Sequence, residues 1–76
     1  MSENIKKTDQ QLHDLAVAIS SEQKERDIIE LALQIHQRKH GGFSEDKTKD
    51  MLKYLELAGL ISNDHKDMII KKLFTE

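Results

Sequence analysis

Apolar residues recur three and four positions apart in four stretches of this chain, and no stretch alternates polar with apolar residues over the length of a strand. Spacing of this kind places side chains on one face of an α-helix, whereas a half-buried strand requires a period of two. The chain has no proline and only three glycines, so little interrupts its helices. The pattern predicts an all-α protein, built as a small bundle of three to four helices.

The first helix is predicted over Asp9–Ile19. Thr8 is in position to cap it, and Gln11, three residues on, can complete a capping box. Residues 1–7 are polar apart from one isoleucine and lack periodicity, so they are expected to form a flexible N-terminal arm. The remaining residues, 8–76, are expected to form a single helical domain.

A stretch of eight residues without an apolar side chain, residues 20–27, follows this helix. Ser20 is predicted to cap a second helix, which ends before the Gly41-Gly42 pair. The alternative is one unbroken helix from Asp9 to Lys39, because neither glycine nor proline interrupts it. Two helices with a tight bend are favoured, since the apolar stripe stops and resumes on either side of this stretch.

The third and fourth helices have clear start and stop signals. Ser44 is predicted to cap the third helix, and Gly59 to close it in the left-handed conformation of a Schellman motif. Ser62 or Asn63 then caps a fourth helix that continues to Phe74.

The second and third helices carry more apolar residues than one buried face requires. In the second helix the stripe is Ile28, Leu31, Ala32 and Ile35, with Ile29 and Leu33 beside it. In the third helix the stripe is Thr48, Met51, Leu52, Leu55 and Ala58, with Tyr54 and Leu57 off it.

This surplus matters because a domain of 76 residues without cysteine has no disulfide to stabilise it. A domain of this size buries only about 60% of its unfolded surface, so self-association is expected to supply stability. We therefore predict a homodimer that also binds another protein. The predicted dimer or partner interface consists of Ile29, Leu33, His36, Tyr54 and Leu57.

Charge and hydropathy favour a cytoplasmic, bacterial-type protein that does not bind a membrane. The formal net charge is −2, which gives no positive field to attract nucleic acid or anionic lipid. No apolar run approaches the roughly 20 residues that span a bilayer, and Met1–Gln10 lacks the apolar middle of a signal peptide.

The candidate catalytic and metal-binding residues all have simpler explanations. His36 and His40 lie at i and i+4, as paired zinc ligands do, but no motif supplies a third ligand. The acidic residues gather where helices begin, where they complement the helix dipole, and the serines are accounted for as caps. No catalytic residue, metal site or cofactor is predicted, and the chain is expected not to be an enzyme.

Two other functions remain as alternatives. Residues 44–73 could form a degenerate helix-turn-helix that binds DNA, although Leu55 and His65 stand where this motif usually has a small and an apolar residue. An inhibitor or antitoxin-type protein encoded by a phage or plasmid fits the same physical pattern.

From Ile28 onward the chain resembles the enterobacterial biofilm and acid-resistance regulators, also called two-component-system connector proteins. The resemblance covers about two-thirds of the chain. It rests on an apolar helix followed by Gly41, Ser44 and Lys47, the Leu55-Glu56 pair and the final Leu73-Phe74. It implies a homodimeric all-α regulator that contacts a response-regulator protein and alters gene expression.

The C-terminal third also resembles the SHOCT module, a short domain usually appended to a larger one. The shared pattern is Leu52-Lys53, then residues 57–62 (Leu-Ala-Gly-Leu-Ile-Ser), then Lys71-Lys72-Leu73. Both resemblances imply interaction rather than catalysis. The function expected from the sequence is therefore that of a small, non-enzymatic regulatory or adaptor protein.

Overall fold

The computed structural model describes residues 4–75, which form four helices: α1 (Asp9–Ile19), α2 (Gln23–His40), α3 (Glu45–Leu57) and α4 (Asn63–Phe74). This confirms the all-α class and the separation of the first two helices. Residues 4–75 contain no strand, and their one isolated bridge joins Ile5 to Phe43. None of the four helices is both long enough and apolar enough to cross a membrane.

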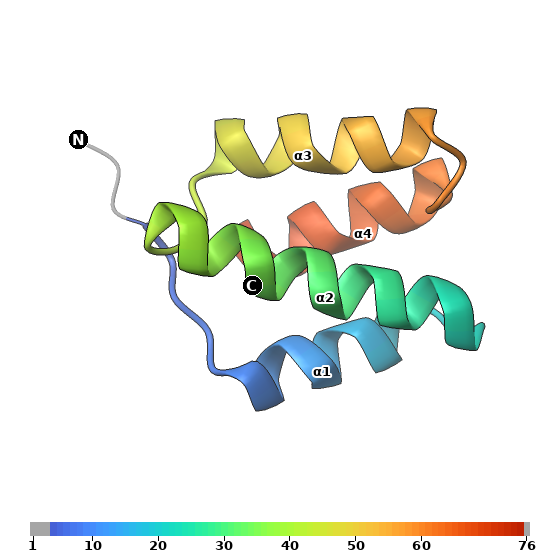
Figure 1. Ribbon diagram of the computed structural model, residues 1–76, viewed down its shortest axis with the longest axis horizontal. Helices are drawn as coiled ribbons and strands as arrows, with labels where there is room; N and C mark the ends of the chain where they lie inside the picture. Colours follow the sequence, from blue (N-terminus) through green and yellow to red (C-terminus); the bar gives the residue numbers. More distant parts are fainter. Residues whose placement is uncertain (1–3, 76) are drawn as a thin grey trace.

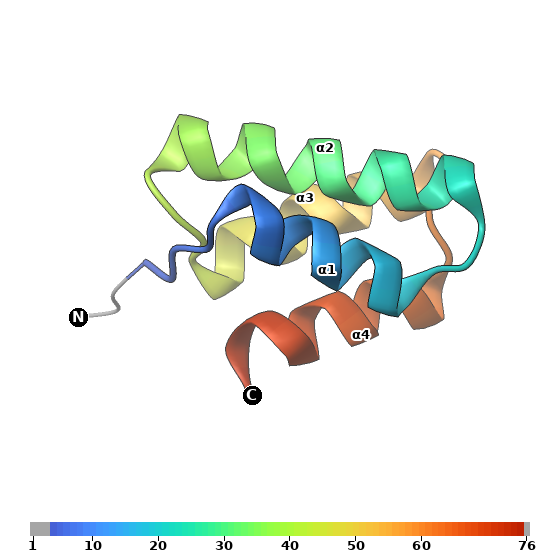
Figure 2. The ribbon, with the colours of Figure 1, turned by 90° about the horizontal axis from the view of Figure 1, so that it is seen from below.

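Each helix runs opposite to the one before it (Figures 1 and 2). The closest packing joins α1 to α2, α3 to α4, and α1 to α4. No packing of this extent joins α2 to α3. The four helices therefore enclose a core, and of the helices that follow one another in the chain, α2 and α3 pack least closely.

The start of α1 follows the sequence prediction, whereas the start of α2 does not. Thr8 and Gln11 form the expected capping box. Ser20 does not cap α2; the cap is Glu22, whose side chain accepts a hydrogen bond from the Glu25 backbone N–H. The Ser20 hydroxyl instead donates to the Glu25 carboxylate at 2.7 Å, and the Ser20 backbone N–H closes α1. The prediction at Ser20 was wrong because a carboxylate one turn into α2 takes up its hydroxyl.

The later helix ends are largely as predicted. Gly59 has a φ of 77°, and the backbone N–H groups of Gly59 and Leu60 donate to Glu56 and Leu55, which is the hydrogen-bond pattern of a Schellman motif. Ser62 caps α4 through a hydrogen bond from the His65 backbone N–H. Ser44 stands at the start of α3, but its side chain makes no capping hydrogen bond.

All four helices and two of the connections contribute to the core. The fully or almost fully buried apolar residues are Leu12, Ala16, Ile19, Ile29, Leu33, Phe43, Leu52, Ile61, Ile69 and Leu73. Phe43, from the connection between α2 and α3, is 0% exposed. The core therefore closes partly with a loop side chain that helix periodicity does not reveal.

The N-terminal segment runs beside the C-terminal end of α2 (Figure 2). Ile5 exchanges backbone hydrogen bonds of 2.9 and 2.7 Å with Phe43, and the Gln37 side chain bonds both backbone groups of Lys7. Of the flexible arm expected over residues 1–7, residues 1–3 lie outside the described residues.

Candidate functional site

The five residues predicted to form an interface do not lie on one surface. Ile29 and Leu33 are fully buried in the core, and His36 is 6% exposed. Tyr54 and Leu57, on α3, are 74% and 72% exposed. Ile29 and Leu33 therefore already have their contacts inside the chain, and only Tyr54 and Leu57 are available to another molecule.

The difference arises from the rotation of α2 about its axis. The sequence pattern assigns Leu31 and Ile35 to the main stripe, yet they are 57% and 55% exposed. The buried side of α2 is instead Ile29, Leu33 and His36. Because the apolar arc of α2 is wide, its sequence is compatible with either rotation, and the position of α1 against α2 selects one of them.

The exposed side of α2 faces α3 across a groove with a volume of about 560 Å³. This groove, called here the α2–α3 groove, lies between the two consecutive helices that pack least closely. Its α2 wall includes Ile35, and its α3 wall includes Tyr54, so two of the most exposed apolar side chains line it. Its apolar lining consists of Ala32, Ile35, Met51, Tyr54 and Leu55.

Cations gather at the end of the groove where α2 finishes and α3 begins. Lys39, His40 and Lys47 line this end, and Asp50 is the one acidic residue among the lining side chains. Neither Lys39 nor Lys47 has an ion-pair partner among residues 4–75. This end therefore carries more positive than negative charge, and neither lysine is paired with a carboxylate of residues 4–75.

His36 lies on the wall of the groove beside these cations. Its ring stacks on Phe43 at a centroid distance of 5.7 Å and lies 4.5 Å from the ring of His40. Burial lowers the pKa of His36, and the positive charges of His40, Lys47 and Lys39 lower it further. Its buried Nε2 has no hydrogen-bond partner among the described residues.

A second polar cluster lies at the opposite end of α2. The Glu25 carboxylate accepts hydrogen bonds from the Ser20 hydroxyl, the Ser62 backbone N–H and the His65 ring, at 2.7, 3.0 and 2.8 Å. Burial raises the pKa of Glu25, but these hydrogen bonds outweigh that effect, and the pKa lies below its usual value.

This cluster contains serine, histidine and a carboxylate, but not in a catalytic arrangement. Ser20 and His65 both bond to Glu25, whereas a serine nucleophile requires a hydrogen bond to the histidine that would take its proton. Ser20 is also 3% exposed. The cluster instead joins the end of α1 and the starts of α2 and α4.

The predicted pairing of His36 with His40 does not extend to a metal centre in the part of the chain that the structure describes. No group of three or more potential ligand residues comes together among residues 4–75. The close approach of the two rings follows from their i, i+4 spacing on α2.

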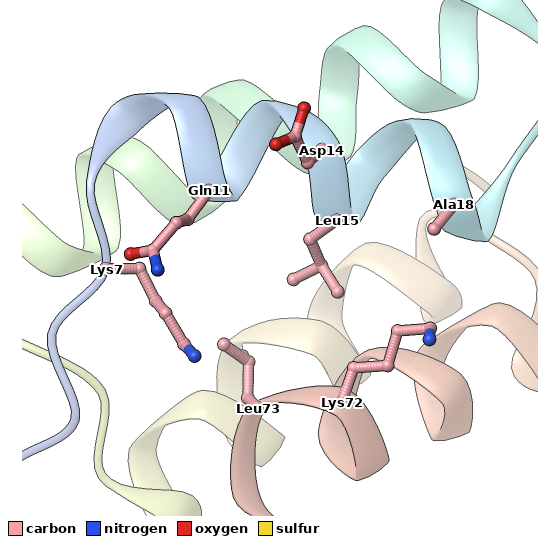
Figure 3. Close-up of a pocket in the computed structure, with 7 residues that line it drawn as sticks. All are labelled: Lys7, Gln11, Asp14, Leu15, Ala18, Lys72 and Leu73. Carbon is pink, nitrogen blue, oxygen red and sulfur yellow. The ribbon is translucent and has the colours of Figure 1, made fainter. Parts of the chain in front are cut away.

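A smaller pocket, of about 280 Å³, lies between α1 and α4 (Figure 3). Leu15 and Leu73 point toward one another across it. The side chains of Lys7 and Lys72 extend into the space between the two helices. It has half the volume of the α2–α3 groove and lacks exposed apolar side chains of comparable size.

The segment considered for DNA binding, residues 44–73, comprises α3 and α4 packed against each other. Lysines line the outer hollow between them, but Lys49 pairs with Glu45, and Lys66 pairs with Glu56. Asp67 lies in the same hollow. These acids reduce the positive field that phosphate groups would meet.

No protein-family model, curated protein or solved structure matches this chain. The two family resemblances seen in the sequence therefore stay predictions.

The sequence patterns did not indicate which apolar and basic residues are exposed in the groove. Ile35 was assigned to the buried stripe, and Lys47 was noted only as part of a family resemblance. The available signal was the combination of a wide apolar arc on the second helix with lysines at both ends of the following connection, Lys39 and Lys47.

Proposed function

We propose that this protein is a small, non-enzymatic regulatory or adaptor protein that binds another protein through the α2–α3 groove. One observation carries the proposal: the groove is walled by Ile35 and Tyr54, apolar side chains that are more than half exposed. Exposed apolar side chains grouped around a groove are typical of protein interaction sites. Binding of another protein would remove them from water.

A pull-down from the source cell, read by mass spectrometry, tests this proposal. The bait variants are Ile35→Glu and Tyr54→Glu, which place a charge in the groove, and the matched control is Lys53→Glu on the outer side of α3. We expect a partner that wild type and Lys53→Glu retain and that both groove variants lose. Circular dichroism must show the same helix content in all four proteins.

The proposal is overturned if Ile35→Glu and Tyr54→Glu retain the same partners as the wild type. Leu33 is unsuitable for this experiment because it is fully buried, and a charge there would unfold the core rather than block a surface.

The homodimer expected from the size of the chain is a separate part of the proposal. Leu57 and Leu60, which are 72% and 43% exposed, do not line the groove and leave apolar surface for a second copy. Sedimentation equilibrium tests it: a dimer that uses this surface persists in Ile35→Glu and is weakened by Leu57→Glu. A monomer at all concentrations contradicts it.

A further inference from the structure

The α2–α3 groove is apolar along most of its length and cationic at one end. Lys39 and Lys47 stand at the cationic end, whereas Tyr54 lies seven residues along α3 from Lys47, about 10 Å away by helix rise. Ile35 lies one helical turn before Lys39 on the other wall. A ligand that fills the groove therefore contacts apolar side chains along most of its length and positive charges at one end.

We propose that the groove binds an amphipathic α-helix of another protein, with its apolar side chains against Ile35 and Tyr54 and its acidic side chains against Lys39 and Lys47. This inference rests on the proposed function and specifies the kind of partner. The inference depends on a match in chemistry: the apolar part of the groove suits the apolar face of such a helix, and the cationic end suits its acidic residues.

The geometry of the groove favours a helix over an extended peptide. An extended peptide usually binds by adding a strand to a sheet edge, and residues 4–75 offer no sheet. The helices α2 and α3 run antiparallel (Figure 1), and the groove between them is lined by side chains of both. A third helix can place side chains at i, i+3, i+4 and i+7 into such a groove.

The charge of the groove favours another protein over a second copy of this chain. A two-fold dimer through the groove would use the same surface on both copies and would bring a second Lys39 and Lys47 into the interface. Within the groove, Asp50 is the only acidic side chain that could offset them. A helix with two or more acidic residues at one end supplies the missing negative charge.

His36 lines the same end of the groove and is 6% exposed. Its Nε2 is enclosed by the chain and is therefore out of reach of a molecule in the groove. The acidic side chains of the partner are thus matched by Lys39 and Lys47 rather than by His36.

The test uses two synthetic helical peptides, each about as long as α3 and labelled for fluorescence anisotropy. Both have leucine at i, i+3, i+4 and i+7; one carries glutamate at one end, and the other carries lysine at the same positions. We expect the full chain to bind the glutamate peptide at least about tenfold more tightly, with an affinity that falls as salt is added.

Two doubly substituted proteins identify the cations responsible. Lys39→Glu with Lys47→Glu reverses the charge at the end of the groove. Lys24→Glu with Lys53→Glu makes the same change of net charge on the same two helices, outside the groove. The groove variant is expected to bind the glutamate peptide at least about tenfold more weakly and to prefer the lysine peptide, while the control binds as the wild type does.

Equal binding of the two peptides by the wild type, or an unchanged preference in the groove variant, overturns the inference. So does self-association that Ile35→Glu abolishes, because the occupant of the groove is then a second copy. If the peptides show no charge preference but the pull-down partner still depends on Ile35 and Tyr54, this inference fails and the proposed function stands. If the partner does not depend on these residues, the proposed function fails.

Discussion

Two polar side chains inside the bundle, Glu25 and His36, have opposite surroundings. The Glu25 carboxylate has three hydrogen-bond donors, whereas the buried Nε2 of His36 has no partner among the described residues. A satisfied buried carboxylate fixes the elements around it, while an unsatisfied ring nitrogen costs stability. At the scale of single residues, the hydrogen bonds of Glu25 thus stabilise the fold, whereas the enclosed ring nitrogen of His36 opposes it.

Replacement of Glu25 is expected to loosen one end of the bundle. Its side chain is 13% exposed, so Glu25→Ala leaves the Ser62 N–H and the His65 ring without their acceptor. We expect the free energy of unfolding to fall by about 2 kcal/mol, measured by urea denaturation. The control Asp67→Asn removes an exposed acid and should change it by less than about 0.5 kcal/mol. Equal effects of the two substitutions would contradict the assignment.

His36 is expected to make the fold sensitive to mild acid. Its pKa in the folded protein lies below the value of 6.5 that applies to the unfolded chain, first because of burial and then because of neighbouring cations. The unfolded chain therefore takes up a proton that the folded protein does not, and stability falls as the pH drops from 6.5 through the folded pKa.

The replacement His36→Phe isolates this effect. Phenylalanine keeps the stacking on Phe43 but has no proton to bind. Urea denaturation at pH 7.5 and pH 5.5 should show a larger loss of stability in the wild type than in the variant. The same loss in both proteins would show that another group titrates in this range.

At the scale of the elements, α2 is the helix whose two faces have different roles. Ile29 and Leu33 pack into the core, whereas Leu31 and Ile35 remain more than half exposed. On a helix as apolar as this one, neighbouring positions separate into core and surface only through their contacts with other helices. The same helix can therefore stabilise the bundle and form one wall of a groove.

Alanine substitutions two residues apart on α2 should separate these roles. Leu33→Ala leaves a cavity in the core and should lower the free energy of unfolding by about 3 kcal/mol. Ile35→Ala removes a side chain that is 55% exposed and should change it by less than about 0.5 kcal/mol. Thermal or urea denaturation measures both, and a reversed order would mean that α2 is rotated differently about its axis.

At the scale of the whole molecule, α1 packs against α2 and α4, and α3 packs against α4, whereas α2 and α3 make no comparable contact. Phe43 and His36, whose rings stack, are buried beside the connection between α2 and α3, so the interior is closed while a groove stays outside it. The arrangement combines a complete core of ten apolar residues with an apolar surface that the single chain does not cover.

A dimer formed by the surface outside the groove would make the stability depend on concentration. We expect the midpoint of thermal unfolding to rise over a roughly hundredfold increase in protein concentration, by mass action. The rise should be the same in Ile35→Glu as in the wild type and smaller in Leu57→Glu. A midpoint that does not move with concentration would show that the monomer alone accounts for the stability.

The local signals in the sequence predicted much of this structure. The Thr8–Gln11 capping box, the closure at Gly59 and the start of α4 after Ser62 all depend on residues within one or two helical turns of each other. Ser20 was the exception, because its hydroxyl is taken by Glu25, five residues along the chain, in a cluster that also needs α4.

The sequence by itself determined the helical class, most of the helix ends and the presence of more apolar side chains than one core requires. Only the tertiary structure decided which of these side chains are buried: Leu33 lies inside and Ile35 outside, although both belong to the apolar arc of α2. Helix formation depends on hydrogen bonds and caps between near neighbours, which the sequence displays directly. Burial depends on which helices pack against each face, and that is set by contacts between residues far apart in the chain.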